Sequence, residues 1–402
     1  MSIILQKMKH LLKNMLSIFN LRVARHVRWN RMSRIPKGIV PRTESWLATQ
    51  GYGRDGITYY QRVIESHVIE RILPKSIHLE IHPAFCKNQR HQVPMAFVAS
   101  IPDGRVWDHT AVISQDDYLL EDLSQWFGPS PVNPVLGRIK LPPAKRFEGE
   151  VVNLAAGAEG YFHWMFDVLP RLHLLSQADG EISNDALFLL NNFRDGYQKE
   201  TSRRAGIPDE QVVTLNEHPH VQASKLTVPS FPGISGHVPK WASDFVRSLF
   251  SDVLGDSQPQ RRLYISRSRA GRRRVVNEDE VRSFLEPLGF ETVHLETMPV
   301  VEQAKLMNEA EAVVGPHGAG LANLVFCKQS TTVIEMFSAR YVNECYWSLS
   351  NHLSLDYYYY VADTNDELRS QSSDGHFSVS LDDLGALLDY AGLETCVGSN
   401  SS

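Results

Sequence analysis

The sequence predicts an α/β protein with a parallel, doubly wound sheet in its C-terminal half. Between Leu263 and Phe337, short apolar runs alternate with segments of helical pattern, as parallel strands joined by helices require. The chain has 402 residues, of which 43% are hydrophobic, and this is enough for two cores. Residues 229–236 are rich in Pro, Gly and Ser, so a domain boundary is expected there.

The individual elements follow from apolar periodicity and helix caps. Asn277 and Glu280 have the spacing of a capping box, so a helix should begin there. The expected order is a strand at 261–267, a helix at 277–288, a strand at 292–295, a helix at 300–309, a strand at 312–314, a helix after Gly320, a strand at 331–337 and a helix at 381–390. We expect this last helix to pack toward the N-terminal domain. The predicted domains are 44–235 and 236–395, preceded by a basic segment at 1–43.

The first candidate site is the loop Gly315-Pro316-His317-Gly318-Ala319-Gly320, which ends an apolar strand. Gly318 and Gly320 allow the backbone to approach a ligand closely, and the N–H groups of the following helix suit an anion such as a diphosphate. The spacing differs from the dinucleotide fingerprint Gly-x-Gly-x-x-Gly. A plain tight turn therefore remains the alternative.

The second candidate site is an arginine-rich loop after the strand at 261–267. Five arginines fall within the eight residues 267–274. A solvated surface loop is the simpler interpretation. The loop nevertheless lies at the carboxyl end of a predicted strand, where open α/β sheets bind ligands, and guanidinium groups match phosphate oxygens in a bidentate way.

The third candidate site is the helical stretch 159–172. His163, Asp167 and Arg171 recur every four residues and share one face. One interpretation is a structural chain of side chains that hydrogen-bond to one another. The other is a catalytic face on the acceptor side, because His and Asp are the usual bases when a hydroxyl loses its proton. Pro170 should kink or end this helix.

Together these three motifs resemble the family-61 glycosyltransferases, which add sugars to glycans and include bacterial polysaccharide-biosynthesis proteins. The resemblance covers about residues 150–360, with the motifs in the right order and spacing. The matching residues are Tyr161-Phe162-His163-Trp164, Leu169-Pro170-Arg171-Leu172, Tyr264-Ile265-Ser266-Arg267, Arg273, Asn277-Glu278, Gly315-Pro316-His317-Gly318-Ala319-Gly320-Leu321, Asn323 and Val333-Ile334-Glu335.

The resemblance implies a GT-B type fold, in which two Rossmann-like domains face a cleft. The domain 44–235 would take the acceptor, and 236–395 would bind the nucleotide-sugar. The implied reaction transfers a sugar with inversion, from a UDP-sugar as first expectation, to a hydroxyl of a glycan or lipid-linked glycan. Synthesis of a capsular or other cell-surface polysaccharide is the implied context.

The resemblance also suggests a role for each motif residue. Asp167 or His163 would be the base, with Arg171 supporting the acceptor side. The donor nucleotide-sugar and its diphosphate would be bound by Ser266, Arg267, Arg273, His317, Gly318, Ala319, Gly320, Asn323 and Glu335. Within this set, Arg267 and Arg273 would stabilise the leaving diphosphate. Glu335 would bind the ribose and His317 the phosphate or donor sugar, with structural hydrogen bonds as the alternative for both.

No metal or other cofactor is expected to be required, because the chain contains no Asp-x-Asp triplet and the arginines can neutralise the diphosphate. The four cysteines show no Cys-x-x-Cys pair, which indicates neither a zinc site nor a disulfide framework. Two alternative functions remain. One is a non-catalytic protein that binds a nucleotide-sugar or glycan, and the other is a nucleotide-sugar epimerase.

The positive charge of the chain is concentrated at its N-terminus. Residues 1–43 contain 10 Lys or Arg and no Asp or Glu, whereas the remainder has a net charge of −15. Apolar residues recur at helical spacing between these cations, which is typical of a helix on an anionic membrane surface. We therefore expect a cytoplasmic protein bound peripherally to the inner face of a membrane, with a helix docked on the protein's own acidic body as the alternative. A nucleic-acid partner is not expected, because no nucleic-acid-binding motif is present.

Overall fold

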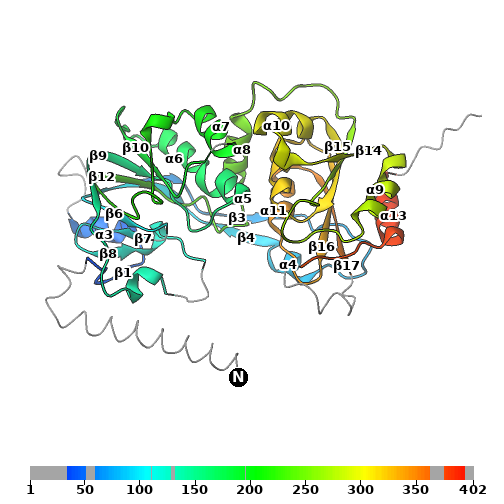
Figure 1. Cartoon of the computed structure of the whole chain (residues 1–402). Coiled ribbons are helices and arrows are strands. Elements are labelled where there is room, and N and C mark those ends of the chain that lie inside the picture. The colour runs from blue at the N-terminus through cyan, green and yellow to red at the C-terminus, as the bar shows by residue number, and fades with distance from the viewer. Residues whose placement is uncertain are drawn as a thin grey trace, which may run out of the picture. The chain divides into compact units, whose positions relative to one another are not determined.

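The computed structural model describes residues 34–50, 59–109, 111–127, 132–194, 196–362 and 375–393 (Figure 1). The predicted amphipathic segment lies almost entirely outside the described residues. The chain divides into two units. Unit 1 takes the described residues of Met1–Ser66 and Met95–Pro232, and unit 2 takes those of His67–Pro94 and Gly233–Ser402. Among the described helices, none is long and apolar enough to cross a membrane.

Unit 2 is built on a five-stranded sheet in which every strand pair is parallel. The strands are β13 (Arg261–Ile265), β14 (Phe290–Val293), β15 (Ala310–Pro316), β16 (Thr332–Ser338) and β17 (Asp356–Ala362). Their order in the sheet is β14-β13-β15-β16-β17. Counted in chain order this is 2-1-3-4-5, one of the two common doubly wound arrangements. The predicted parallel sheet of the C-terminal half is therefore confirmed.

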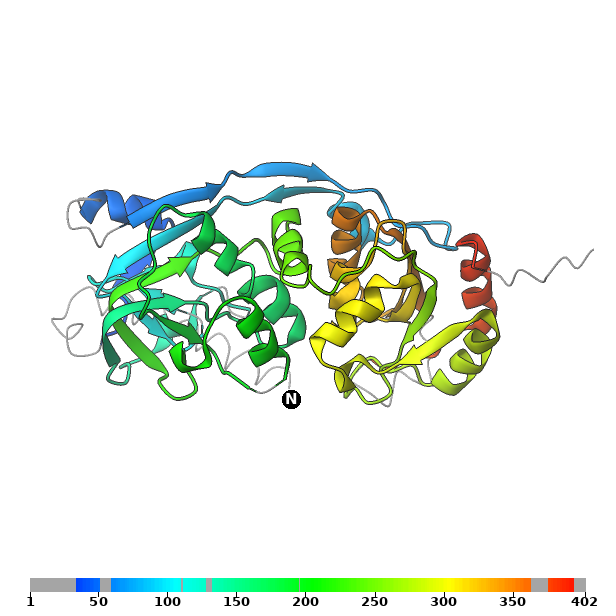
Figure 2. The same ribbon diagram turned by 90° about the horizontal axis from the view of Figure 1, so that it is seen from above.

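Helices cover both faces of this sheet, and Figure 2 shows α11 and α13 on opposite sides of it. On one face, α9 (Glu278–Leu285) and α13 (Leu381–Tyr390) share an apolar core with inward side chains of the strands. On the other face lie α10 (Val300–Asn308), the 3₁₀ helix η7 (Ala319–Phe326) and α11 (Cys345–Leu353), with α8 (Lys240–Ser248) packed on η7 and α11. Two short 3₁₀ turns, η5 (Glu286–Leu288) and η6 (Leu295–Thr297), complete the connections.

Two details of these helices differ from the sequence predictions. The helix α13 has the expected bounds but packs on the sheet of unit 2, because its buried face, Leu384, Leu387 and Leu388, joins that core. At the start of α9, the Asn277 side chain makes no cap hydrogen bond to the helix. Its amide instead exchanges hydrogen bonds of 2.9 Å with the backbone of Val379, which ties α9 to the segment before α13.

Unit 2 also contains a segment from the N-terminal half, His67–Pro94, which the sequence analysis placed within 44–235. It forms the antiparallel pair β3 (His67–Glu70) and β4 (Arg90–Val93) and the short helix α4 (Pro83–Lys87). Lys75 pairs alongside β17 in parallel, opposite Tyr358. Phe85 is fully buried, with its ring 4.7 Å from that of Tyr359 and 5.4 Å from that of Trp347. Aromatic packing of this kind attaches the segment to unit 2.

Unit 1 contains a mixed sheet. Its strands are β1 (Gly38–Val40), β2 (Tyr59–Ile64), β5 (Ala96–Pro102), β6 (Arg105–Trp107), β7 (Ala111–Ile113), β8 (Tyr118–Leu120), β9 (Lys145–Asn153), β10 (Leu187–Leu190), β11 (Val212–Thr214) and β12 (His220–Pro229). The path runs β1-β8-β7-β6-β12-β9-β10-β11, and β5 pairs with β12 and β2. Strands β9 to β12 pair in parallel, whereas β2, β5, β6 and β7 pair antiparallel. Unit 1 is thus α/β, but a second Rossmann-like domain is not confirmed.

The helices of unit 1 are short. They are α3 (Thr43–Gln50), α5 (Tyr161–His163), the π-helical turn η3 (Trp164–Val168), α6 (Arg171–Gln177) and α7 (Tyr197–Arg204), with 3₁₀ turns η1 (Glu121–Leu123), η2 (Pro134–Gly137) and η4 (Asp209–Gln211).

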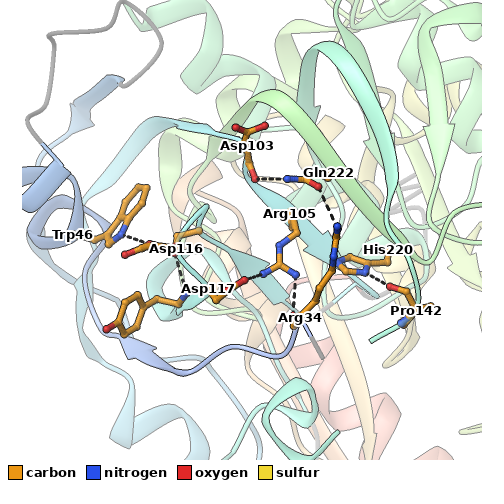
Figure 3. Close-up of polar contacts among 11 residues, drawn as sticks. Arg34, Trp46, Asp103, Arg105, Asp116, Asp117, Pro142, His220 and Gln222 are labelled. Carbon is orange, nitrogen blue, oxygen red and sulfur yellow. Dashed lines mark hydrogen bonds and ion pairs between the residues drawn. The ribbon is translucent and has the colours of Figure 1, made fainter. Parts of the chain in front are cut away.

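A polar network ties the chain after Arg34 to β6 and β12 (Figure 3). The buried Arg105 guanidinium donates to the Arg34 carbonyl at 2.8 Å and pairs with Asp117. His220 donates from Nδ1 to the Pro142 carbonyl at 2.7 Å, and burial lowers the pKa of His220 to about 4. A buried polar network is destabilising when some of its hydrogen bonds are missing. These contacts therefore hold the chain at Arg34 and at Pro142 against β6 and β12.

Candidate functional site

The first candidate site lies at the carboxyl edge of the sheet of unit 2, between β13 and β15. These strands are neighbours, but the chain leaves β13 toward α9 on one face and leaves β15 toward η7 on the other. Open α/β sheets bind ligands where successive connections diverge in this way. Arg267 follows β13, and His317 and Gly318 follow β15, so the two loops predicted from sequence meet at this point.

Arg267 lies directly over Gly318. A Cβ atom on Gly318 would be 1.8 Å from Nη1 of Arg267, so the guanidinium would have to move. Gly318 itself has an extended backbone, with φ 177°. The residue is therefore glycine because of the guanidinium above it and not because of its own conformation.

Arg273 brings a second positive charge to the same place. Its backbone is left-handed, with φ 53°, and its guanidinium lies 4.7 Å from the centre of the Tyr341 ring. Burial, together with the charge of Arg273, lowers the pKa of Arg267. The Nε atoms of both arginines are buried and have no hydrogen-bond partner within the described part of the chain. Unpartnered buried donors on two like charges call for an anion.

The start of the arginine loop is held by Glu278, the first residue of α9. Its Oε1 atom accepts hydrogen bonds from the Tyr264 hydroxyl at 3.1 Å, Ser266 Oγ at 2.9 Å and the Arg267 N–H at 3.2 Å. A carboxylate is also favoured at a helix N-terminus. Ser266 is buried in this arrangement. Its position favours anchoring the loop over the predicted contact with a donor.

His317 is oriented by a buried carboxylate. Its Nδ1 atom is 2.5 Å from Oε1 of Glu335, and the other carboxylate oxygen accepts from the Tyr357 hydroxyl at 2.5 Å. Glu335 is fully buried, so this geometry supports an orienting role and gives no support to the predicted ribose contact. The His317 ring also lies 5.3 Å from those of Tyr341 and Tyr346.

The remaining loop residues are mainly structural. Asn323 is fully buried, and its Nδ2 atom donates to Gln303 at 2.7 Å and to the Gly320 carbonyl at 3.1 Å. The N–H of Leu321, expected to bind a diphosphate, donates to the Gly318 carbonyl at 3.0 Å. Ala319 and Gly320 begin η7 beside the arginines, and their predicted contacts stay predictions.

The second candidate site is the His163–Asp167 pair of unit 1. His163 ends α5, and Asp167 lies in the π-helical turn η3 just before Pro170. Nδ1 of His163 is 2.7 Å from Oδ2 of Asp167. The imidazole side chain is 29% exposed and the carboxylate only 6%. The pair was predicted from the four-residue spacing, whereas the break expected at Pro170 takes the form of a π turn, a common feature of functional helices.

Arg171 is bound to the backbone of unit 1, and its predicted support of the acceptor side stays a prediction. Its guanidinium is fully buried and donates to the backbone carbonyls of Pro229, Ala155 and Asn153 at 2.7–3.0 Å. Burial lowers the pKa of Arg171 to about 9, and the charge of Asp167 opposes this shift. Arg171 thus holds together the ends of β9 and β12.

Sequence reasoning missed several residues of these sites. Glu278 appeared in a motif without a role, and Tyr341 and Tyr357 were not singled out for the site. Their contribution depends on contacts across neighbouring strands, which one-dimensional spacing does not show. No group of three or more His, Cys, Asp or Glu that could hold a metal occurs in the part of the chain that the structure describes.

Comparison with known proteins assigns these motifs to a family. Residues 161–334 match the family model described as glycosyltransferase 61. This region is similar to the family-61 glycosyltransferases. It contains the His163–Asp167 pair, the arginine loop and the loop around Gly318, and the predicted family resemblance is confirmed.

Curated plant proteins carry similar stretches. The alpha-1,3-arabinosyltransferase XAT3 of Oryza sativa subsp. japonica is 40% identical over 103 residues, which cover 23% of this chain and 18% of the relative. The beta-1,2-xylosyltransferase XYXT1 of the same organism is 39% identical over 70 residues, covering 17% of this chain and 15% of the relative. The matched stretches thus span less than a fifth of these relatives.

Proposed function

We propose that this protein is a glycosyltransferase that moves a sugar from a nucleotide-sugar to a hydroxyl of a glycan, with inversion at the anomeric carbon. The observation that carries the proposal is the pair of arginines at the carboxyl edge of the unit 2 sheet, whose buried Nε atoms have no hydrogen-bond partner among the described residues, within the region that matches family 61. A nucleoside diphosphate gains negative charge as the glycosidic bond breaks, so fixed positive charges at that point favour the transition state.

On the donor side, Arg267 and Arg273 would contact the departing diphosphate. His317 would contact the phosphate or the donor sugar through Nε2. Its Nδ1 atom is hydrogen-bonded to Glu335, which fixes the orientation of the imidazole ring. The relatives are named arabinosyl- and xylosyltransferases, which favours a UDP-pentose as the donor to be tested first.

On the acceptor side, His163 would be the base. The Asp167 carboxylate would accept a hydrogen bond from Nδ1–H of His163. The neutral imidazole then has its lone pair on Nε2, where it can take the proton of an acceptor hydroxyl. The carboxylate of Asp167 is too buried to reach a substrate directly and would orient the ring. An inverting transfer needs this one base and no covalent nucleophile.

The wider predictions remain part of the proposal. These are a GT-B type pair of Rossmann-like domains, a glycan or lipid-linked glycan acceptor, a role in capsular or cell-surface polysaccharide synthesis, and a peripheral position on the cytoplasmic face of a membrane through residues 1–43. The membrane position is supported by the charge of residues 1–43, which contain ten Lys or Arg and no Asp or Glu. Each basic residue contributes about 1 kcal/mol of binding free energy near an acidic leaflet. Deleting residues 1–33 should abolish sedimentation with anionic vesicles.

The decisive experiment combines ligand binding with turnover. UDP should raise the melting temperature of the wild-type protein, and Arg267→Ala should remove most of this shift and lower turnover about 10²–10³-fold. Lys at this position should rescue only in part, because it lacks the planar fork. If Arg267→Ala melts far below the wild type while its folded fraction keeps normal turnover, the loop is structural.

A second measurement separates the alternatives. His163→Ala and Asp167→Asn should both reduce transfer while UDP binding persists. Unchanged transfer in both variants would contradict the base assignment. Conversion of the donor sugar without any acceptor would identify an epimerase, and UDP-sugar binding without turnover under any condition would identify a binding protein.

A further inference from the structure

Two consecutive aromatic side chains, Trp126 and Phe127, are exposed in unit 1, and Phe127 lies next to His163 of the His163–Asp167 pair. Trp126 is 36% exposed and Phe127 is 50% exposed. The centre of the Phe127 ring is 6.0 Å from that of His163, with 43° between the ring planes. A single exposed aromatic side chain is ordinary on a protein surface. Two consecutive ones, of which Phe127 lies beside a candidate base, need a reason.

The segment that carries these rings is attached to the loop leading into α5. Oε1 of Gln125 accepts a hydrogen bond from the Gly157 N–H at 2.9 Å. A Cβ atom on Gly157 would lie 2.7 Å from the Gln125 carbonyl oxygen, so the two backbones touch closely. Ser124 adds a second attachment, since its Oγ atom accepts from the Val112 N–H at 3.0 Å and donates to the Leu120 carbonyl at 2.6 Å. The residues just before Phe127 are therefore held on the same scaffold as His163.

Polar groups suited to hydroxyls lie at the start of the same helix. A pocket is lined by Glu159, Gly160, Trp164, Asn191 and Asn192, among others. Oε1 of Glu159 accepts from the Asn192 amide at 2.8 Å. Of these groups, the Glu159 carboxylate is exposed, whereas Asn192 is buried. A carboxylate at the start of α5 and an exposed aromatic ring on the segment attached to the preceding loop are groups that a sugar can use, because a sugar presents hydroxyls at its edge and C–H groups on its face.

We propose that Phe127 is the stacking platform for the acceptor, and that the acceptor unit is a pyranose whose C–H face lies on this ring. A sugar stacked on this ring would lie beside the His163 imidazole, since the two ring centres are 6.0 Å apart. This inference rests on the proposed function, since it specifies what the acceptor side binds. It adds a residue outside the family-61 match, which begins at residue 161.

The test measures glycan binding by calorimetry in the absence of any donor, with cellotetraose, xylotetraose and mannotetraose as probes. Phe127→Ala should weaken the binding of the preferred probe about tenfold, which corresponds to the loss of one aromatic contact. Phe127→Tyr should restore it, because the ring face is kept. Tyr390→Ala, which removes an exposed aromatic side chain of α13 in unit 2, is the matched control and should bind as the wild type does.

The outcomes separate this inference from the proposed function. Equal affinities of the wild type and Phe127→Ala, or no binding of any probe by the wild type, would overturn the platform. Binding that depends on Phe127 in a protein that never turns over a nucleotide-sugar would support the platform and count against the transferase. The UDP-induced rise in melting temperature, measured on each variant, shows that unit 2 remains folded.

Discussion

Gly318 shows how one absent methyl group positions a charged side chain. The Arg267 guanidinium occupies the space that a Cβ atom would need, at 1.8 Å. Gly318→Ala should therefore displace the guanidinium, weaken UDP binding by about tenfold or more and lower turnover about 10²-fold, while the melting temperature changes little. Titration calorimetry with UDP checks the first effect.

Gly320→Ala is the matched control, because its Cβ atom would meet only Ile265 and Leu295 side chains at 3.4 Å, an ordinary contact. If both alanine variants lost UDP affinity equally, the requirement would be for backbone freedom in the whole loop and not for the space above Gly318.

The proposed role of the two arginines also predicts that no metal is required. If they supply the positive charge that a divalent cation would otherwise bring to the diphosphate, turnover should survive EDTA. The measurement is the initial rate with and without EDTA in excess over the metal in the buffer. Complete loss of turnover that Mn²⁺ or Mg²⁺ restores would show that carboxylates not recognised in this chain bind a metal.

At the scale of elements, the start of α9 determines the shape of the arginine loop. Glu278→Ala leaves the Tyr264 hydroxyl, Ser266 Oγ and the Arg267 N–H without their shared acceptor. We expect a loss of about 2 kcal/mol in the free energy of unfolding and a raised KM for the donor. Denaturant unfolding and steady-state kinetics measure the two effects.

Asp279→Ala provides the control within the same helical turn. The Asp279 side chain is 99% exposed and lies 3.6 Å from Arg282. An exposed ion pair of this kind contributes little, so neither stability nor KM should change appreciably. If both variants lost the same amount of stability, the effect would come from removing negative charge at the N-terminus of α9 and not from the hydrogen bonds of Glu278.

The same elements show what sequence can predict. Four of the five strands of unit 2 and the bounds of α13 were predicted from local apolar runs, whereas β17 was not predicted. The His163–Asp167 contact follows from helical spacing alone. Local patterns do not show which unit α13 packs on. They also do not show the hydrogen bonds between the Asn277 side chain and the Val379 backbone, which join residues about a hundred positions apart.

At the scale of the whole molecule, the least predictable feature is that unit 2 draws on two separate stretches of the chain. The segment His67–Pro94 carries no motif, and its attachment rests on Phe85 among the aromatic side chains of β17 and α11. Composition can indicate a boundary near Pro232, but it cannot show that an earlier segment returns to the second unit. This segment also reaches the site, since Phe85 lies 6.4 Å from Tyr357, which donates to Glu335.

The stability of both units should depend on pH through buried neutral histidines. Burial lowers the pKa of His220 in unit 1 and of His352 in unit 2 to about 4. Each ring donates to a backbone carbonyl, that of Pro142 and that of Val238. In the unfolded chain a histidine has a pKa of about 6.5 and takes up a proton below that value. The unfolded state then binds more protons than the folded state, so stability falls as the pH decreases from about 6.5 toward 4.

The size and the source of this effect can be measured with single substitutions. Each histidine should contribute up to about 3 kcal/mol of this loss, since one pKa unit corresponds to about 1.4 kcal/mol. Melting temperatures between pH 7.5 and 4.5 should therefore fall less steeply for His220→Gln and His352→Gln than for the wild type, because glutamine can donate to the same carbonyl without taking up a proton. His67→Gln, at an exposed histidine of β3, should keep the wild-type slope. If His220→Gln and His352→Gln also kept that slope, carboxylates would be the source of the acid sensitivity, and both imidazoles would have to be protonated within the folded protein.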